Sequence, residues 1–125
     1  MNAPDVEVVR ARLGDVQIAV ELFKLQSLLT TREASGVRLV DVSRALGAEK
    51  PDLAHVGLIA QRSGPPLGLC LGTVLGFTTL TRRAIHPLPS WTHRLIPKFL
   101  YPACARDEDG GAVWLIDVTR LEEPS

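Results

Sequence analysis

The sequence predicts an all-β protein composed of two small, related β-subdomains. Three observations favour this fold class: apolar and polar residues alternate over several short stretches, glycine-containing turns separate these stretches, and a segment that ends a strand occurs twice in similar form. With 125 residues, of which 46% are hydrophobic, the chain can bury the core of about one domain.

The opening of the chain has the pattern of a β-hairpin. Residues 8–13 alternate between apolar and polar side chains, Gly14 and Asp15 form a turn-tolerant pair, and the alternation resumes over residues 16–22. Beyond Glu21 the spacing changes, with leucines at positions 22, 25, 28 and 29. This spacing fits either a short amphipathic helix or a bent strand.

The rest of the first half is predicted to end in a strand and one tight turn. The segments are a polar loop at residues 30–36, a β-branched strand at residues 37–42 and a polar connector at residues 49–52. Asp41 or Ser43 is placed to cap a single helical turn, which stops at Gly47.

The second half begins with another predicted hairpin. Its two strands and its turn are residues 56–61, residues 67–75 and residues 63–66. Along the second strand, Gly68, Cys70 and Gly72 alternate with leucines, which leaves one strand face almost bare. A bare face permits close approach of another backbone or a ligand, and it also accompanies the curvature of a barrel.

The last third of the chain holds a long surface excursion and a third hairpin. The excursion covers the proline-rich residues 85–97, with a helical turn around residues 91–95; the hairpin strands are residues 101–106 and 112–118, around a turn at residues 107–111; residues 119–123 close the chain. Phe77, before the excursion, fits either a buried position, which we expect, or an exposed contact residue of an interface. Trp91 and Tyr101 flank it, either as anchors of the loop or as contacts for a partner.

A short internal repeat organises these elements into two subdomains. Residues 40–46, Val-Asp-Val-Ser-Arg-Ala-Leu, return as residues 116–121, Ile-Asp-Val-Thr-Arg-Leu. We expect subdomain 1 at about residues 1–50 plus the C-terminal segment, and subdomain 2 at about residues 53–118.

The first half is the shorter one. It spans far fewer positions between its turn glycine, Gly14, and Asp41 than the second half spans between Gly64 and Asp117. An element of the second half therefore has no counterpart in the first.

The charge balance and the apolar segments exclude several classes of partner. The 14 basic and 14 acidic residues cancel, so nucleic acid is not an expected partner. Residues 1–9 lack the basic start and apolar stretch of a secretory signal, which predicts a cytoplasmic protein. The apolar region at residues 56–80 is interrupted by Gln61, Arg62 and two prolines. We expect two strands there and no membrane insertion.

Residues that could carry chemistry are few and scattered. Cys70 and Cys104 lie far apart, and the three histidines have no established metal-ligand spacing. Cys70 has apolar neighbours and is expected to be a packed, reduced thiol. Asp41 and Asp117 each begin the same strand-to-turn element and are interpreted as caps. We therefore expect no metal, no cofactor and no catalytic residue.

Several segments resemble the CheW family of bacterial chemosensory coupling proteins. Residues 66–76, Pro-Leu-Gly-Leu-Cys-Leu-Gly-Thr-Val-Leu-Gly, are similar to the family's core strand, and residues 39–47, Leu-Val-Asp-Val-Ser-Arg-Ala-Leu-Gly, to its valine-aspartate-leucine-arginine segment. Pro87, Pro89 and residues 115–121 match later landmarks, so the resemblance covers almost the whole chain in order. It implies a CheW-like fold of two small SH3-like five-stranded β-barrels, the first one shortened, and a non-catalytic adaptor.

The sequence departs from the family mainly in its first half. An asparagine-leucine-arginine-glycine segment expected roughly fifteen to twenty residues before Asp41 is absent, Ser27 occupies the position of a glutamate near that arginine, and Gly72 replaces an aspartate. Losing both charges together is coherent, because a buried carboxylate without its partner destabilises a fold. The shortened form resembles the short CheW-like protein of the Frz gliding-motility pathway and implies that kinase binding is weakened or lost.

The resemblance implies a protein-binding strip at Phe23, Lys24, Leu25, Gln26 and Leu28. The implied partner is the cytoplasmic domain of a methyl-accepting chemoreceptor, with other CheW-like proteins and a CheA-type kinase as further candidates. By spacing alone, Leu25 and Leu28 also fit positions in the core. An alternative hypothesis is a small-ligand-binding β-barrel, in which the bare glycine face borders a pocket.

Overall fold

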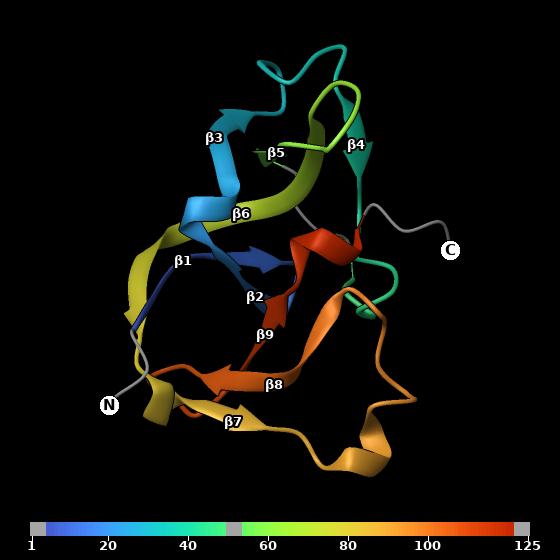
Figure 1. Ribbon diagram of the computed structural model, residues 1–125. Helices are drawn as coiled ribbons and strands as arrows, with labels where there is room; N and C mark the ends of the chain where they lie inside the picture. The colour runs from blue at the N-terminus through green and yellow to red at the C-terminus, as the bar shows by residue number, and fades with distance from the viewer. Residues whose placement is uncertain (1–4, 50–53, 122–125) are drawn as a thin grey trace.

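The computed structural model describes residues 5–49 and 54–121, and it is built from strands (Figure 1). The strands are β1 Val6–Leu13, β2 Val16–Glu21, β3 Leu25–Thr30, β4 Arg38–Val40, β5 His55–Ile59, β6 Leu67–Leu80, β7 Ile85–Pro87, β8 Leu100–Arg106 and β9 Ala112–Ile116. Four single 3-10 turns join them: η1 Leu22–Lys24, η2 Arg82–Ala84, η3 Ser90–Thr92 and η4 Val118–Arg120. The described residues contain no α-helix, which confirms the predicted all-β class.

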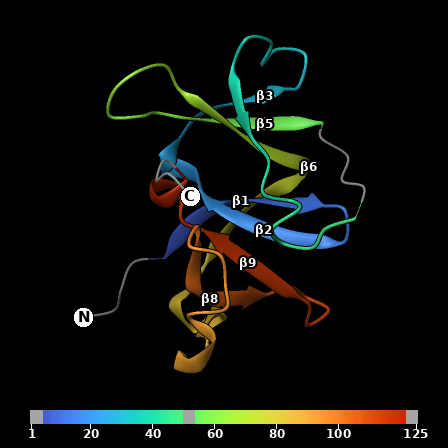
Figure 2. The same ribbon diagram turned by 90° about the vertical axis from the view of Figure 1, so that its right-hand side faces the viewer.

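The strands form one continuous hydrogen-bonded path that folds into two groups. The order is β3-β5-β6-β1-β2-β9-β8-β7, with β4 paired to β6. The small group consists of β3, β4, β5 and the first half of β6, and the large group of the second half of β6 with β1, β2, β9, β8 and β7. Figures 1 and 2 show the two groups above and below one another, with β6 running between them.

The long strand β6 bends because of one glycine. Gly72 has a φ of +69°, and a Cβ atom there would lie 2.2 Å from the backbone oxygen of Arg12. Register shifts flank this point, against β5 between His55 and Val56 and against β1 between Arg10 and Ala11. Such bulges bend and twist a strand. The bare glycine face therefore serves the curvature of the sheet and the close approach of β1.

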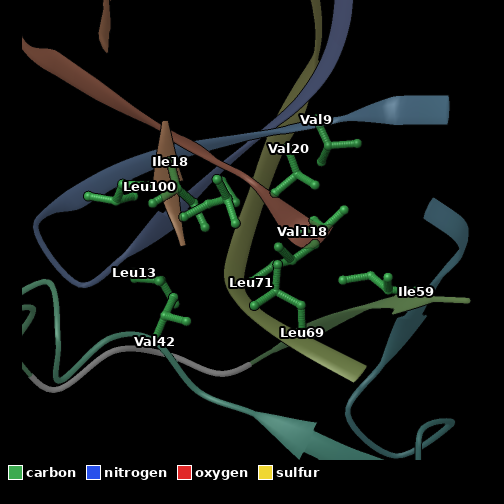
Figure 3. Close-up of a cluster of buried hydrophobic side chains, with 12 residues drawn as sticks. Val9, Leu13, Ile18, Val20, Val42, Ile59, Leu69, Leu71, Leu100 and Val118 are labelled. Atoms are coloured by element: carbon green, nitrogen blue, oxygen red, sulfur yellow. The ribbon is translucent and has the colours of Figure 1, made fainter. Parts of the chain in front are cut away.

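The main core lies between the two groups (Figure 3). Its buried members come from strands of both: Val9, Ala11, Leu13, Ile18, Val20, Val42, Ile59, Leu69, Leu71, Leu100, Ile116 and Val118. A second, smaller cluster lies inside the large group and consists of Val8, Ala19, Leu80, Ala105 and Val113. Because neighbouring residues of β1 point to opposite faces, Val8 and Val9 contribute to different clusters. β1 is thus buried on both sides.

The leucine spacing after Glu21 is produced by a bulged strand. The chain makes the turn η1 and enters β3, where the register against β5 shifts between Leu25 and Ser27. The extra residue lets Leu25 and Leu28 both pack against the main core, which Leu22 of η1 also contacts. A spacing of three, which is typical of a helix, arises here without one.

Two sequence-based expectations about the second half are wrong. β6 continues to Leu80, beyond the predicted end at Leu75, because the bulge near Gly76 lets pairing with β1 go on. Residues 85–87 of the predicted excursion form β7, an edge strand antiparallel to β8. Proline is tolerated there because the outer side of an edge strand needs no amide donor.

Most of the remaining segments match their predictions. The three hairpins β1–β2, β5–β6 and β8–β9 are antiparallel pairs of consecutive strands, and η3 provides a helical turn at the start of the predicted segment 91–95. The predicted boundary between subdomains, around residues 50–53, lies outside the described residues. The division into subdomains stays a prediction.

Candidate docking site

The predicted binding strip begins on the turn that joins β2 to β3. Phe23 occupies the middle of η1 with 76% of its surface exposed. The ammonium nitrogen Nζ of Lys24 lies 5.8 Å from the centroid of the Phe23 ring. A cation–π contact of this kind contributes about 0.5–1 kcal/mol at an exposed site. Together they present an aromatic ring and a positive charge on one short turn.

The leucines of the strip lie differently from Phe23. Leu25 and Leu28 are half-buried and pack against the main core. Leu25 extends over Gly57 of β5, where a Cβ atom would come within 3.0 Å of its Cδ2. Gln26, at the bulge between them, is exposed. In this strip Phe23 and Gln26 are therefore exposed and Lys24 is half-exposed. Leu25 and Leu28 support the strip from the core.

The strip continues along an open sheet edge. β3 stands at one end of the strand order and pairs with β5 alone among the described strands. The outer side of β3 therefore presents backbone groups that another strand can meet. The exposed turn and this edge are adjacent in the chain, because η1 runs directly into β3.

Phe77 is a candidate contact residue outside the predicted strip. Contrary to the expected burial, 63% of its surface is exposed. It pairs with Val9 of β1, which in turn pairs with Val20 of β2, three residues before Phe23. Cross-strand partners point to the same face of a sheet. Phe77 thus lies on the same face of the sheet as Val9 and Val20, whose side chains belong to the main core.

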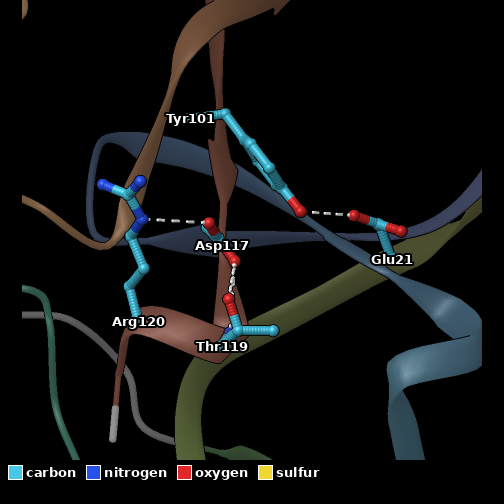
Figure 4. Close-up of polar contacts among 5 residues, drawn as sticks. All are labelled: Glu21, Tyr101, Asp117, Thr119 and Arg120. Atoms are coloured by element: carbon cyan, nitrogen blue, oxygen red, sulfur yellow. Dashed lines mark hydrogen bonds and ion pairs between the residues drawn. The ribbon is translucent and has the colours of Figure 1, made fainter. Parts of the chain in front are cut away.

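A polar cluster lies beyond η1, where β2, β8 and the C-terminal turn meet (Figure 4). The Tyr101 hydroxyl donates a hydrogen bond of 2.7 Å to Oε1 of Glu21. Arg120 and Asp117 form an ion pair, with Nε and Oδ2 3.4 Å apart. Burial, and then the hydrogen bond to Glu21, raise the pKa of Tyr101 far above its usual value. Tyr101 is thus an anchor between β8 and β2.

Next to this cluster, the large group forms a half-open pocket of about 250 Å³. Its lining comprises Val6, Val8, Ala19, Glu21, Leu80, Ile85, Tyr101, Pro102, Ala103, Leu115 and Ile116. Apart from the carboxylate of Glu21 and the hydroxyl of Tyr101, these side chains are apolar. The surface exposed to the pocket is almost entirely apolar.

The remaining side chains that could react lie in surroundings typical of residues with a structural role. Cys70 is buried, and its burial raises the pKa of its thiol. The described residues hold no group of three or more His, Cys, Asp or Glu side chains able to bind a metal ion. In the described part of the chain, every helix is too short or too polar to cross a membrane.

Asp41 and Asp117 act as caps, as the internal repeat predicted. Oδ1 of Asp41 accepts the backbone N–H of Ser43 at 2.9 Å, and Oδ1 of Asp117 accepts that of Thr119 at 3.2 Å. The two copies of the repeat thus make the same local turn.

Comparison with known proteins identifies the fold. No family model matches the sequence, and no curated protein matches it. Among solved structures, the scaffolding protein TtCheW from Thermoanaerobacter tengcongensis is similar, with a TM-score of 0.71 at 15% sequence identity. The match covers 98% of this chain and 95% of that chain. The chain therefore has the CheW-like fold, all-β throughout its described residues.

Proposed function

We propose that the protein is a non-catalytic adaptor of a bacterial chemosensory array. Its partner is the cytoplasmic tip of a methyl-accepting chemoreceptor, which it contacts through Phe23, Lys24, Leu25, Gln26 and Leu28. The observation that carries the proposal is the similarity to a scaffolding protein over almost the full length of both chains. The proposal places the protein in the cytoplasm, with other CheW-like proteins as further neighbours in the array.

The local structure of the strip supports a contact role for its exposed half. Aromatic side chains such as Phe23 bury a large area on binding and are frequent centres of binding energy. A monomer gains nothing from exposing 76% of a phenylalanine on a turn whose neighbouring leucines are already in the core. Leu25 and Leu28 then hold the turn in position, while Phe23 and Gln26 meet the partner.

We further propose that binding to a CheA-type kinase is weakened or lost. The small group has four described strands, β6 included, one fewer than the five of each barrel in the implied fold. By the resemblance, the missing asparagine-leucine-arginine-glycine segment is expected about fifteen to twenty residues before Asp41, in the first half of the chain. A surface that requires that strand is then incomplete. The short CheW-like protein FrzB of the Frz pathway is the form that this arrangement resembles.

A binding comparison tests the proposal. The purified protein is titrated with a receptor cytoplasmic fragment and, separately, with a CheA-type kinase, as wild type and as Phe23→Ala. We expect receptor binding with at least about tenfold loss in Phe23→Ala, an unchanged melting temperature, and little kinase binding. Trp91→Ala is the matched control, because Trp91 is 71% exposed but lies on the distant excursion.

The variant Leu25→Asp distinguishes a residue that supports the strip from one that contacts the partner. Since Leu25 packs on the core, this variant is expected to lower the melting temperature, whereas Phe23→Ala is not. Robust kinase binding without receptor binding would overturn the proposal. So would a folded Phe23→Ala variant that binds the receptor as well as wild type does.

A further inference from the structure

We propose that two copies of the protein associate about a two-fold axis, with Trp91 of each copy inserted into the apolar pocket of the other. The inference goes beyond the adaptor role, because it involves neither the binding strip nor a receptor. Two features that the adaptor role leaves unexplained carry it. One is an exposed tryptophan on an ordered turn, and the other is the half-open pocket of the large group next to it.

The turn η3 and the residues after it hold two large apolar side chains in water. Trp91 is 71% exposed and Leu95 is 73% exposed. The backbone N–H and the hydroxyl of Thr92 both donate hydrogen bonds to the carbonyl oxygen of Pro89, at 2.9 and 2.6 Å. Ile96, just beyond, packs against the main core. The segment is thus anchored on both sides of Leu95, and Trp91 is presented at a fixed place on the surface.

The pocket lies close to this turn. Pro102 of β8 lines the pocket and is itself exposed, so it borders the open side. The backbone N–H of Leu88 donates a hydrogen bond of 2.9 Å to the carbonyl oxygen of Pro102. Trp91 follows Leu88 by three residues, which span at most about 11 Å. A projecting side chain next to a recess forms a self-complementary patch, which a two-fold axis matches to the same patch of a second copy.

The pocket fits an indole ring in size and in polarity. Its volume of about 250 Å³ exceeds the roughly 150 Å³ that is enough to bind the smaller benzene ring in an apolar protein cavity. Val8, Leu80 and Leu115 are among the residues that line it, and its exposed surface is almost entirely apolar. Transfer of an aromatic ring from water into such surroundings is favourable. Because the pocket is half-open, the indole N–H stays in contact with water.

The area of the contact predicts a weak dimer. One aromatic side chain buries about 150–250 Å², so two reciprocal contacts, walls included, bury about 600–1,000 Å² in total. Stable interfaces bury about 1,200–2,000 Å². We therefore expect a dissociation constant on the order of 0.1–1 mM. At the low-micromolar concentrations of a receptor titration the protein is then monomeric, and Trp91→Ala remains a valid control there.

Analytical ultracentrifugation of the purified chain, from low-micromolar to millimolar concentration, tests the proposal. We expect a reversible monomer–dimer equilibrium that stops at the dimer. Trp91→Ala, and Ala103→Leu at the half-buried lining of the pocket, are each expected to weaken association at least about tenfold. Phe77→Ala is the matched control, because Phe77 is 63% exposed but does not line the pocket. A wild type that stays monomeric would overturn the proposal, as would assemblies larger than a dimer.

Fluorescence and a competitor locate the contact. The chain has two tryptophans, Trp91 and Trp114, so Trp114→Phe leaves the emission of Trp91 alone. This emission is expected to shift to shorter wavelength as the dimer forms, and free indole is expected to dissociate the dimer by occupying the pocket. Indole that binds a monomeric wild type would assign the pocket to a free small molecule instead.

The variants keep the test decisive. Melting temperatures verify that each variant is folded, and Trp91→Ala changes an exposed side chain, so it serves even where Ala103→Leu does not fold. Dimers that persist in Trp91→Ala would place the interface elsewhere and refute the assignment. None of these measurements needs a receptor, so their failure is distinct from failure of the adaptor role.

Discussion

Gly72 and Gly64 both have a positive φ angle, but their surroundings differ. A Cβ atom at Gly72 would meet the backbone oxygen of Arg12 at 2.2 Å, whereas one at Gly64 would meet nothing within 4 Å. An alanine pays about 1–2 kcal/mol for the left-handed conformation at either position. Only at Gly72 must the backbone of β1 also move.

The first prediction therefore compares Gly72→Ala with Gly64→Ala. We expect Gly64→Ala to lower the free energy of unfolding by about 1 kcal/mol, and Gly72→Ala to lower it by at least about 2 kcal/mol more because of the backbone clash. Urea denaturation of the two variants measures the difference. Equal losses would mean that close approach of β1 does not require a glycine at this bend.

Tyr101 offers a second prediction, since it is the only tyrosine in the chain. Burial and the hydrogen bond to Glu21 raise its pKa in the folded protein. The resulting stability is fully present below the unfolded pKa of about 10 and is lost as pH rises above it toward the folded pKa. Tyrosinate absorbance is therefore expected to stay low above pH ~10 until the protein unfolds. In Glu21→Gln, which removes the charge, tyrosinate is expected at lower pH; an ordinary titration in the wild type would contradict the burial of the hydroxyl.

For single residues, the sequence predicted the capping aspartates correctly but did not predict which apolar side chains are exposed. Asp41 and Asp117 were predictable because an aspartate before a turn bonds backbone amides two residues on. For Phe77 the sequence favoured burial over an exposed contact, because an aromatic residue in an apolar strand is usually buried, whereas 63% of its surface is exposed. The division of the binding strip into exposed residues such as Phe23 and core-packed residues such as Leu25 depends on a bulge, the one in β3.

Individual elements differ in how far their geometry is determined by contacts between residues that are near one another in the sequence. The turn between β8 and β9 is local, because Asp107 accepts the backbone N–H groups of Asp109 at 3.0 Å and Gly111 at 2.6 Å. β3 is not, since its leucine spacing became a bulged strand only through pairing with β5. β7 has three residues and a proline, too short a run for any periodicity to reveal it.

The β8–β9 turn gives the third prediction. Hydrogen bonds from Gly111 and from Gln17 lower the pKa of Asp107. This contribution to stability is present above the unfolded pKa of about 4 and is lost as pH falls through the lower, folded pKa. Asp107→Asn is therefore expected to show a smaller loss of stability on acidification than wild type. Thermal unfolding between neutral and strongly acidic pH measures it, with Asp109→Asn, in the same turn, as the control; identical pH profiles for wild type and Asp107→Asn would exclude this role.

For the whole molecule, local patterns predicted the hairpins and not the long-range pairings. Consecutive strands joined by a tight turn can be predicted from the glycine of the turn and from the alternation of apolar and polar residues in the strands. The pairings β1–β6, β2–β9 and β4–β6 have no such signal, because they form to bury the shared core. Strands from both halves of the sequence consequently appear in both groups, an arrangement that the internal repeat does not reveal.

The fourth prediction concerns cooperativity. β6 belongs to both groups, and one core cluster lies between them. The groups are therefore expected to unfold together in one transition. Native-state hydrogen exchange measures this: amides of β5 and of β9 should open with the same free energy. A lower opening free energy for β5 alone would show that the small group unfolds independently.

The parallel pairing of β2 with β9 has a consequence for how the protein is made. Gln17 pairs with Val113 and Val20 with Ile116, so β2 must wait for a strand that is synthesised much later. Chains emerge from the ribosome N-terminus first, and the β1–β2 ribbon therefore leaves it before either of its neighbours, β6 and β9, exists. The sheet closes only after β9 has been synthesised, and until then the outer edge of β2 is open to pairing with other strands.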